Sequence, residues 1–377
     1  MNDKSLGIYL HIPFCKSRCI YCDFVSSVGD CKDMDRYVEY LCRQIKSEGE
    51  RYSDDYIVDT VYFGGGTPTL LSRENLIRLS KSIQDNFKLQ LKEFSVEANP
   101  CTVDKEKLAA LKEAGVNRLS IGVQTFNDSL LKTLGRRHDR RQAIEAIKLA
   151  KDFGFEVSVD CMLALPNQTL LDLKEFVEIA DGLGVDHISA YMLSVEEGTP
   201  LQKLIKEKVL VQKSDAESAE FYDYIYSSLK EKGFCRYEIS NFCKENKYSF
   251  HNLRYWQRKD YLGMGLSAHS LINGERWRCP DNFDEYYSLS DKGEMMRLDR
   301  EILSIDDKKS EYIMLALRLE DGLDVETYEQ TFRGNFSEEY AYAIKKNLPY
   351  IIFDGKRLRI KEEYIKVMNS IAVDFLK

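Results

Sequence analysis

This chain of 377 residues lacks any long uninterrupted apolar run. A membrane-spanning helix needs roughly 20 such residues, so the sequence argues against a helical membrane protein. The N-terminal segment also lacks the apolar stretch of a signal peptide. No long basic run supplies the positive surface expected for a nucleic-acid partner. These absences, with a net charge of −8, predict a cytoplasmic protein that does not bind nucleic acid.

Cysteine, in contrast, is plentiful, with ten residues. Three of them lie within eight residues, in Cys15-Lys-Ser-Arg-Cys19-Ile-Tyr-Cys22. Thiolates are the usual ligands of a cubic iron–sulfur cluster, with one for each iron. Three thiolates leave one iron with an open position, which is typical of reactive rather than structural metal sites. The spacing therefore favours a [4Fe–4S] cluster.

Three other interpretations of these thiols are weaker. A structural zinc site needs a fourth ligand, for which Cys31 or His11 is available, but zinc ligands usually come as separated pairs. Three unrelated buried thiols are unexpected in a polar segment. A disulfide needs an oxidising compartment, which nothing in the sequence indicates. The remaining cysteines are scattered, mostly among apolar neighbours, and are interpreted as inert thiols.

Short apolar segments alternate with helical patterns over the first part of the chain. The segments rich in β-branched and aromatic residues are 7–12, 57–63, 93–98, 117–123, 156–162 and 187–193. This alternation predicts parallel βα units with right-handed crossovers. Six units are too few for a closed barrel of eight, so we expect an α/β fold with an open, partial (β/α)6 TIM-like barrel.

The alternation lapses near residue 211, which predicts three regions. Residues 1–210 form the partial barrel, residues 211–300 a barrel extension, and residues 301–377 a small module. Within the extension, residues 237–269 are expected to be loop-like. In the last region, helical patterns and a hairpin over 350–353 and 357–360 indicate a small helical, winged-helix-like module.

The polar and glycine-rich features lie where such a barrel places its active site. The cysteines follow the first predicted strand, and the glycines at 64–66 follow the second. Glu97 and Gln124 end the third and fourth strands, and Asp160 lies in the fifth. The carboxyl ends of parallel barrel strands face one mouth. We therefore expect these residues to line one site.

These motifs resemble the radical S-adenosylmethionine (SAM) superfamily, and within it the oxygen-independent coproporphyrinogen III oxidase-like family. The resemblance spans nearly the whole chain. It is carried by His11-Ile-Pro-Phe-Cys15 with Cys19 and Cys22, GGGTPT at 64–69, SVEANP at 95–100, SIGVQTFND at 120–128, Asp160 before Leu165-Pro166, YEISNF at 237–242 and HNLRYW at 251–256.

The resemblance implies that Cys15, Cys19 and Cys22 bind the cluster and that SAM chelates its open iron. Glycine at 65 and 66 would let the backbone approach the methionyl ammonium without a Cβ in the way. The planar guanidinium of Arg136 suits the methionyl carboxylate. The residues implied to bind SAM are Tyr9, Tyr21, Gly65, Gly66, Thr67, Glu97, Gln124, Arg136 and Asp160.

Two departures from the oxidase pattern make the chain most similar to the haem chaperone (HemW) branch. The oxidase has a further cysteine where this chain has Phe24, and a long extension where this chain has fourteen residues before Cys15. The HNLRYW sequence is associated in the chaperone branch with haem binding. A ring nitrogen of His251 can bind haem iron, and Tyr255 and Trp256 can stack on a porphyrin. His269 is a second candidate ligand.

The resemblance therefore predicts a haem chaperone that transfers haem to unidentified acceptor proteins, with membrane-associated respiratory proteins among the candidates. It also implies a low-potential electron donor. Two rival interpretations stay open: oxidative decarboxylation of coproporphyrinogen III in porphyrin biosynthesis, and radical SAM chemistry on another substrate. Bound SAM and consumed SAM need the same ligands, so no catalytic residue is assigned. We expect no coproporphyrinogen oxidase activity.

Overall fold

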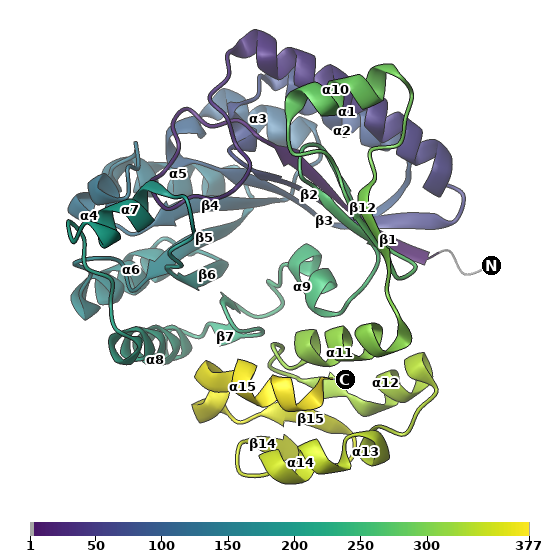
Figure 1. The fold of residues 1–377 in the computed structure, drawn as a ribbon. Coiled ribbons are helices and arrows are strands. Elements are labelled where there is room, and N and C mark those ends of the chain that lie inside the picture. The colour runs from purple at the N-terminus through teal and green to yellow at the C-terminus, as the bar shows by residue number, and fades with distance from the viewer. Residues whose placement is uncertain (1–3, 377) are drawn as a thin grey trace.

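The computed structural model describes residues 4–376. The first three residues of the predicted barrel region and residue 377 of the predicted C-terminal module lie outside the described residues. The described chain contains a twelve-stranded sheet, in the order β12-β11-β10-β9-β1-β2-β3-β4-β5-β6-β8-β7, and a three-stranded sheet, in the order β13-β15-β14. Figure 1 shows the large sheet curved around an open interior, with most helices on its outer face.

Six consecutive parallel strands make up the centre of the large sheet, each paired with the next along the chain. This open βα barrel confirms the predicted fold class. The strands are β1 (Lys4–Ile12), β2 (Tyr56–Gly65), β3 (Lys88–Ala98), β4 (Arg118–Gln124), β5 (Glu156–Leu163) and β6 (His187–Met192). The helices between them are α1 (Cys31–Tyr52), α2 (Arg73–Asn86), α3 (Lys105–Glu113), α4 (Asp128–Thr133), α5 (Arg140–Asp152) and α6 (Leu170–Gly182), with 3₁₀ turns at Pro68–Leu70 and Pro100–Thr102.

The two-residue period of the strands separates the core from the barrel interior. In β1, Leu6, Ile8 and Leu10 are fully buried in the main hydrophobic core. Because successive strand side chains point to opposite faces, Tyr9 and His11 lie on the other face, which lines the interior. Capping boxes start helices α1 and α6 at Asp30 and Thr169.

The expected loop-like character of residues 237–269 is wrong. This stretch contains β8 (Asn241–Cys243), α9 (Phe250–Trp256) and β9 (Tyr261–Met264), and β9 pairs in parallel with β1. Elements of three to seven residues are too short to show a periodic pattern. The neighbouring elements are α7 (Pro200–Lys206), α8 (Asp215–Glu231), β7 (Cys235–Arg236), β10 (His269–Ile272), β11 (Glu275–Arg278), α10 (Phe283–Asp291) and β12 (Leu298–Ile302). Helix α9 lies on the concave side of the sheet in Figure 1.

The C-terminal elements have a hydrophobic core of their own, in which Tyr328, Phe336 and Phe375 are fully buried. The predicted hairpin is present, because β14 and β15 pair antiparallel. The division of the chain at residues 210 and 300 stays a prediction. The elements are α11 (Ile305–Ala316), β13 (Leu323–Asp324), α12 (Val325–Phe332), α13 (Phe336–Glu339), α14 (Ala341–Asn347), β14 (Ile351–Phe353), β15 (Arg357–Ile360) and α15 (Met368–Ala372), with 3₁₀ segments at Glu362–Val367 and Val373–Phe375.

Across residues 4–376, no helix combines the length and the apolar character that a membrane crossing requires.

Candidate functional site

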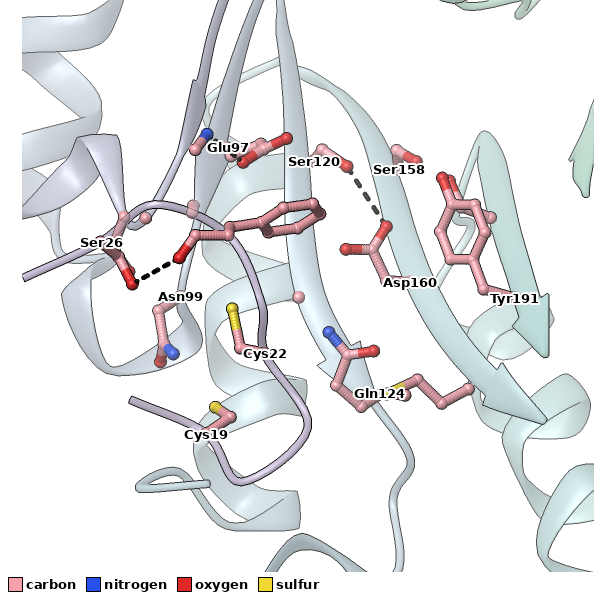
Figure 2. Close-up of a pocket in the computed structure, with 18 of the residues that line it drawn as sticks. Cys19, Cys22, Ser26, Glu97, Asn99, Ser120, Gln124, Ser158, Asp160 and Tyr191 are labelled. Carbon is pink, nitrogen blue, oxygen red and sulfur yellow. Dashed lines mark hydrogen bonds between the residues drawn. The ribbon is translucent and has the colours of Figure 1, made fainter. Parts of the chain in front are cut away.

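The barrel interior holds a continuous cavity of about 670 Å³. This volume lies within the range of small-molecule and cofactor sites, roughly 300–1,000 Å³. Figure 2 shows Cys19 and Cys22 on the loop that faces the strands carrying Glu97, Gln124 and Asp160. The cavity brings together every predicted site residue except Trp256 and His269, namely Tyr9, Cys15, Cys19, Tyr21, Cys22, Gly65, Gly66, Thr67, Glu97, Gln124, Arg136, Asp160, His251 and Tyr255.

Trp256 is one of the two predicted site residues that do not line this cavity. Its ring packs near the guanidinium of Arg318, at 5.8 Å from the ring centre. Neighbouring residues of a helix point about 100° apart, so Tyr255 and Trp256 of α9 do not face the same side. His269 is exposed on β10 and is also not part of the cavity wall. The predicted stacking of Trp256 on a porphyrin therefore has no counterpart in this cavity.

The three clustered cysteines lie on the loop after β1, and each is a partly buried free thiol. The loop is tied back on itself, because the Cys15 N–H donates to the Ser27 carbonyl at 2.9 Å and the Ser27 N–H donates to the Pro13 carbonyl at 2.7 Å. A guanidinium nitrogen of Arg136 donates to the Cys19 sulfur at 3.5 Å. The three thiols therefore lie on a loop that backbone hydrogen bonds fix in place, next to the guanidinium of Arg136.

The arrangement of these thiols bears on the kind of metal they can bind. Among residues 4–376, no three His, Cys, Asp or Glu side chains are grouped around one metal-sized point. A cubic cluster instead takes one thiolate at each of three separate irons. Burial raises the pKa of the Cys15 and Cys22 thiols, and bonding to iron would offset that cost by holding each sulfur as a thiolate.

The glycine-rich turn after β2 is required by packing within the protein. Gly65 has φ +113°, and a Cβ there would lie 2.5 Å from the His11 ring. A Cβ on Gly66 would lie 2.6 Å from the Phe14 carbonyl oxygen. These glycines therefore let two segments of the chain approach each other, which differs from the predicted reason, space for a ligand. The Gly65 N–H donates to Glu97 at 3.1 Å, so the turn also positions that carboxylate.

Two carboxylates face the cavity in an environment that disfavours their charge. Glu97 accepts a hydrogen bond from the Tyr62 hydroxyl at 2.9 Å, and Asp160 accepts one from Ser120 at 3.5 Å. Burial and the nearby Asp160 raise the pKa of Glu97 to about 7. Burial also raises the pKa of Asp160 to about 6. A cationic ligand group would restore the charged forms, as the ammonium and sulfonium groups of SAM could.

Arg136 provides the complementary charge on the same wall. Its Nε is buried without a hydrogen-bond partner, and one of its terminal nitrogens donates to the Gly122 carbonyl. A buried donor without a partner costs free energy that a ligand acceptor would recover. The cavity wall thus contains a guanidinium with an unpartnered N–H near the cysteines. It also contains two carboxyl groups, Glu97 and Asp160, whose pKa values are raised. These groups fit a zwitterionic ligand such as SAM.

The opposite end of the cavity contains His251 and Tyr255, one helical turn apart on α9. The two ring nitrogens of His251 are both engaged, with Thr60 Oγ1 at 2.9 Å from Nδ1 and the Tyr255 hydroxyl at 2.9 Å from Nε2. The imidazole also stacks on Tyr62, with ring centres 5.3 Å apart. Burial lowers the pKa of His251 to about 3, so the ring is neutral.

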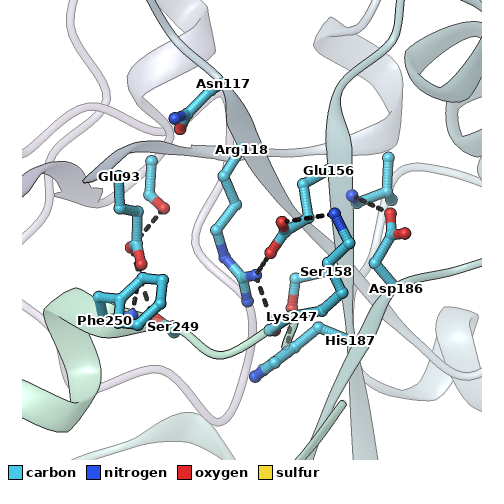
Figure 3. A network of polar contacts seen from close by, with 12 residues as sticks. Glu93, Asn117, Arg118, Glu156, Ser158, Asp186, His187, Lys247, Ser249 and Phe250 are labelled. Atoms are coloured by element: carbon cyan, nitrogen blue, oxygen red, sulfur yellow. Dashed lines mark hydrogen bonds and ion pairs between the residues drawn. The ribbon is translucent and has the colours of Figure 1, made fainter. Parts of the chain in front are cut away.

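Glu93 holds the start of α9 and was not predicted from sequence. Its buried carboxylate accepts hydrogen bonds from the Ser249 hydroxyl at 3.3 Å and from the backbone N–H groups of Phe250 and His251. Figure 3 shows the Glu93 side chain directed at this helix start. A carboxylate stabilises a helix N-terminus. The only sequence signal was an acidic residue within an apolar strand.

A second polar network closes the end of the barrel where the parallel strands begin. Arg118, the first residue of β4, forms an ion pair with Glu156. His187, the first residue of β6, bonds Ser158 at 2.7 Å and the Tyr237 hydroxyl at 2.8 Å. Figure 3 shows these side chains converging at the strand starts. Arg118, Ser158 and His187 also line the cavity, so its floor is polar.

Comparison with known proteins agrees with this architecture. The radical SAM superfamily model matches residues 9–180, and the HemN C-terminal domain model matches residues 303–363. The haem chaperone HemW of Lactococcus lactis is 33% identical over 381 residues, which covers 100% of this chain and 98% of that protein. HemW of Bacillus subtilis is 36% identical and covers 92% of this chain and 90% of that protein.

Among solved structures, coproporphyrinogen III oxidase (HemN) from Escherichia coli, a radical SAM enzyme, superposes with a TM-score of 0.87. The match covers 99% of this chain and 90% of the oxidase chain, at 23% sequence identity. At that identity the likeness establishes the fold, which the two chains share from the barrel through the C-terminal elements.

Proposed function

Because the chain belongs to the radical SAM superfamily, in the family of the haem chaperone HemW, we propose that it binds haem and transfers it to acceptor proteins. In this proposal its barrel also holds a SAM-ligated [4Fe–4S] cluster. The observation that carries the proposal is the full-length similarity to HemW, which reaches 98% of the Lactococcus protein. The cavity supports it, because the cysteine loop and the His251–Tyr255 pair line the same cavity.

Three thiols and a cation would hold the cluster and SAM. Cys15, Cys19 and Cys22 would each bind one iron, and Arg136 would bind the methionyl carboxylate through its unpartnered Nε. When bound and reduced, the cluster supplies low-potential electrons for chemistry on SAM. Glu97 lies across the cavity and would pair with a positive group of SAM, which favours its ionised form.

An aromatic wall would hold the flat face of a porphyrin. Tyr9 stacks on Tyr62, with ring centres 6.1 Å apart and 22° between the rings, and Tyr62 stacks on His251. These rings lie along the barrel interior between the cysteine loop and α9. Such a wall excludes water and offers area for stacking. The haem acceptors would be proteins outside this chain, with respiratory membrane proteins as the first candidates.

The test is a parallel assay of one anaerobically reconstituted preparation. We expect about one haem bound per chain, haem that moves to respiratory membranes depleted of haem, and no conversion of coproporphyrinogen III. The Cys19→Ala variant serves as the control for cluster dependence. Formation of protoporphyrinogen by a preparation without haem affinity would replace the proposal with the oxidase activity.

A further inference from the structure

Both ring nitrogens of His251 are committed within the protein, which leaves no lone pair for a metal. The imidazole is 1% exposed and is fixed by Thr60 on one side and Tyr255 on the other. Its backbone N–H is held by Glu93 at 3.3 Å. For His251 to bind iron, the ring would have to break the bond to Tyr255 and expose Nε2.

Among residues 4–376, three tyrosine–histidine pairs are joined by a hydrogen bond. The other hydrogen bonds of each pair decide whether its tyrosine can act as a ligand. In the first, His11 Nε2 lies 2.8 Å from the Val25 carbonyl. A carbonyl only accepts, so Nε2 carries the hydrogen and Nδ1 carries a lone pair. The Tyr9 hydroxyl, 3.1 Å from Nδ1, must therefore donate. A Tyr9 phenolate would face a lone pair and be repelled.

The second pair is Tyr237 and His187, whose oxygen and Nε2 lie 2.8 Å apart. Tyr237 is not part of the cavity wall, and its oxygen also accepts a hydrogen bond from the Ser249 N–H at 3.3 Å. This pair therefore cross-links the floor of the barrel, and its tyrosine oxygen does not face the cavity.

The third pair, Tyr255 and His251, has neither restriction. Tyr255 lines the cavity, and its oxygen lies 2.9 Å from His251 Nε2. Thr60 faces the other ring nitrogen, and a hydroxyl can donate as well as accept. When Thr60 donates to Nδ1, Nε2 carries the hydrogen and can donate to a Tyr255 phenolate. In this tautomer Nε2 offers its hydrogen to the Tyr255 oxygen. Burial raises the pKa of the free Tyr255 phenol, so a bound cation such as ferric iron would be needed to hold it as a phenolate.

We infer that Tyr255, through its phenolate oxygen, is the iron ligand for ferric haem, and that His251 positions and stabilises that oxygen by donating from Nε2. The inference rests on the proposed haem-binding function. Tyrosine is an established haem ligand type in proteins. On binding, the phenol O–H bond breaks and an oxygen–iron bond forms. The proton leaves to solvent, and no electron is transferred.

The variant pair Tyr255→Phe and His251→Ala separates the two ligand assignments. Tyr255→Phe removes the oxygen and keeps the ring, whereas His251→Ala keeps the oxygen. Tyr261→Phe is the matched control, because that ring packs edge-on against Tyr255 with centres 4.7 Å apart and lies outside the cavity wall. The probe is ferric haem added to the cluster-containing protein.

The measurement is resonance Raman spectroscopy of the haem complex, with ring-deuterated tyrosine to identify iron–phenolate bands. We expect these bands in the wild type, His251→Ala and Tyr261→Phe, and their loss in Tyr255→Phe. Haem affinity of His251→Ala should fall by about 10–100-fold, as for other groups that orient a metal ligand. Retention of the bands in that variant shows that His251 acts through Tyr255.

Three outcomes overturn the inference, and they differ from one another. A wild-type spectrum without phenolate bands, altered in His251→Ala and unchanged in Tyr255→Phe, makes His251 the ligand. Bands that persist in Tyr255→Phe assign the iron to another tyrosine, for which Tyr9→Phe is the next variant. Absence of haem binding by the wild type refutes the proposed function itself, and the inference with it.

Discussion

Replacing Gly65 by alanine tests how tightly the turn after β2 is packed. The residue has φ +113°, and an added Cβ would lie 2.5 Å from one atom of the His11 ring and 2.6 Å from another. That ring is pinned by hydrogen bonds to Tyr9 and to the Val25 carbonyl. It cannot move aside without breaking one of them, so the substitution must strain the turn or displace the imidazole.

The expected loss of stability has two parts. A non-glycine residue in the left-handed region costs about 1–2 kcal/mol, and overpacking a filled site costs about 1–3 kcal/mol. Together they predict that Gly65→Ala lowers the free energy of unfolding by about 2–5 kcal/mol. Gly115→Ala is the matched control, because Gly115 has φ +86° and nothing within 4 Å of its Cβ position. It should lose only the first part.

Urea unfolding of the two variants and the wild type, followed by circular dichroism under anaerobic conditions, measures this difference. The turn also donates the Gly65 N–H to Glu97, so its displacement should weaken SAM binding. The effect of SAM on the electron paramagnetic resonance spectrum of the reduced cluster reports that loss. If Gly65→Ala is as stable as Gly115→Ala, the packing argument is wrong. If it is destabilised and the SAM effect is unchanged, the turn does not position Glu97 for the ligand.

Three further predictions concern other groups at the site. Cys19→Ala should lose the iron and the visible absorption of the reconstituted cluster, whereas Cys101→Ala should keep both, and an intact cluster in the first variant would remove the cysteine assignment. Glu97 has its pKa raised from 4.5 to about 7, so its contribution to the stability of the ligand-free protein is present below pH 4.5 and lost as the pH rises through about 7. Glu97→Gln should therefore exceed the wild type in stability by on the order of 1–3 kcal/mol at pH 8 and by much less at pH 4.5, and an equal difference at both pH values in denaturant unfolding would contradict this. Glu93→Ala should lower the free energy of unfolding by about 1–3 kcal/mol, because it leaves the buried hydrogen-bond donors at the start of α9 without an acceptor, and a neutral result in the same assay would show that α9 is held by other contacts.

The central strands were predictable because each is a short apolar segment rich in β-branched and aromatic residues, bounded by helical patterns. The cysteine loop, the Gly65 turn, Glu97 and Asp160 were predictable as neighbours for a related reason: parallel strands bring their carboxyl ends to one mouth. Once the end of each strand is located in the sequence, the residues at those ends can be predicted to lie near one another at the mouth of the barrel.

The contacts of α9 were not predictable, because their partners lie far away in the sequence. Glu93 precedes the helix start at Ser249 and Phe250 by more than 150 positions, and no local pattern links them. The same holds for Trp256, because the direction in which its side chain faces depends on how α9 packs against the sheet. Strand β9 has four residues, too few to reveal a period, and only its pairing with β1 defines it.

Under the proposed function, in which SAM and haem both bind in the barrel, the continuity of the cavity has a thermodynamic consequence. The same 670 Å³ is bounded at one end by the cysteine loop and at the other by the His251–Tyr255 pair. If SAM lowers the affinity of the chain for haem by some factor, linkage requires haem to lower the affinity for SAM by that same factor. The fraction of chains that bind haem would then depend on the concentration of SAM, and the fraction that bind SAM would depend on the concentration of haem.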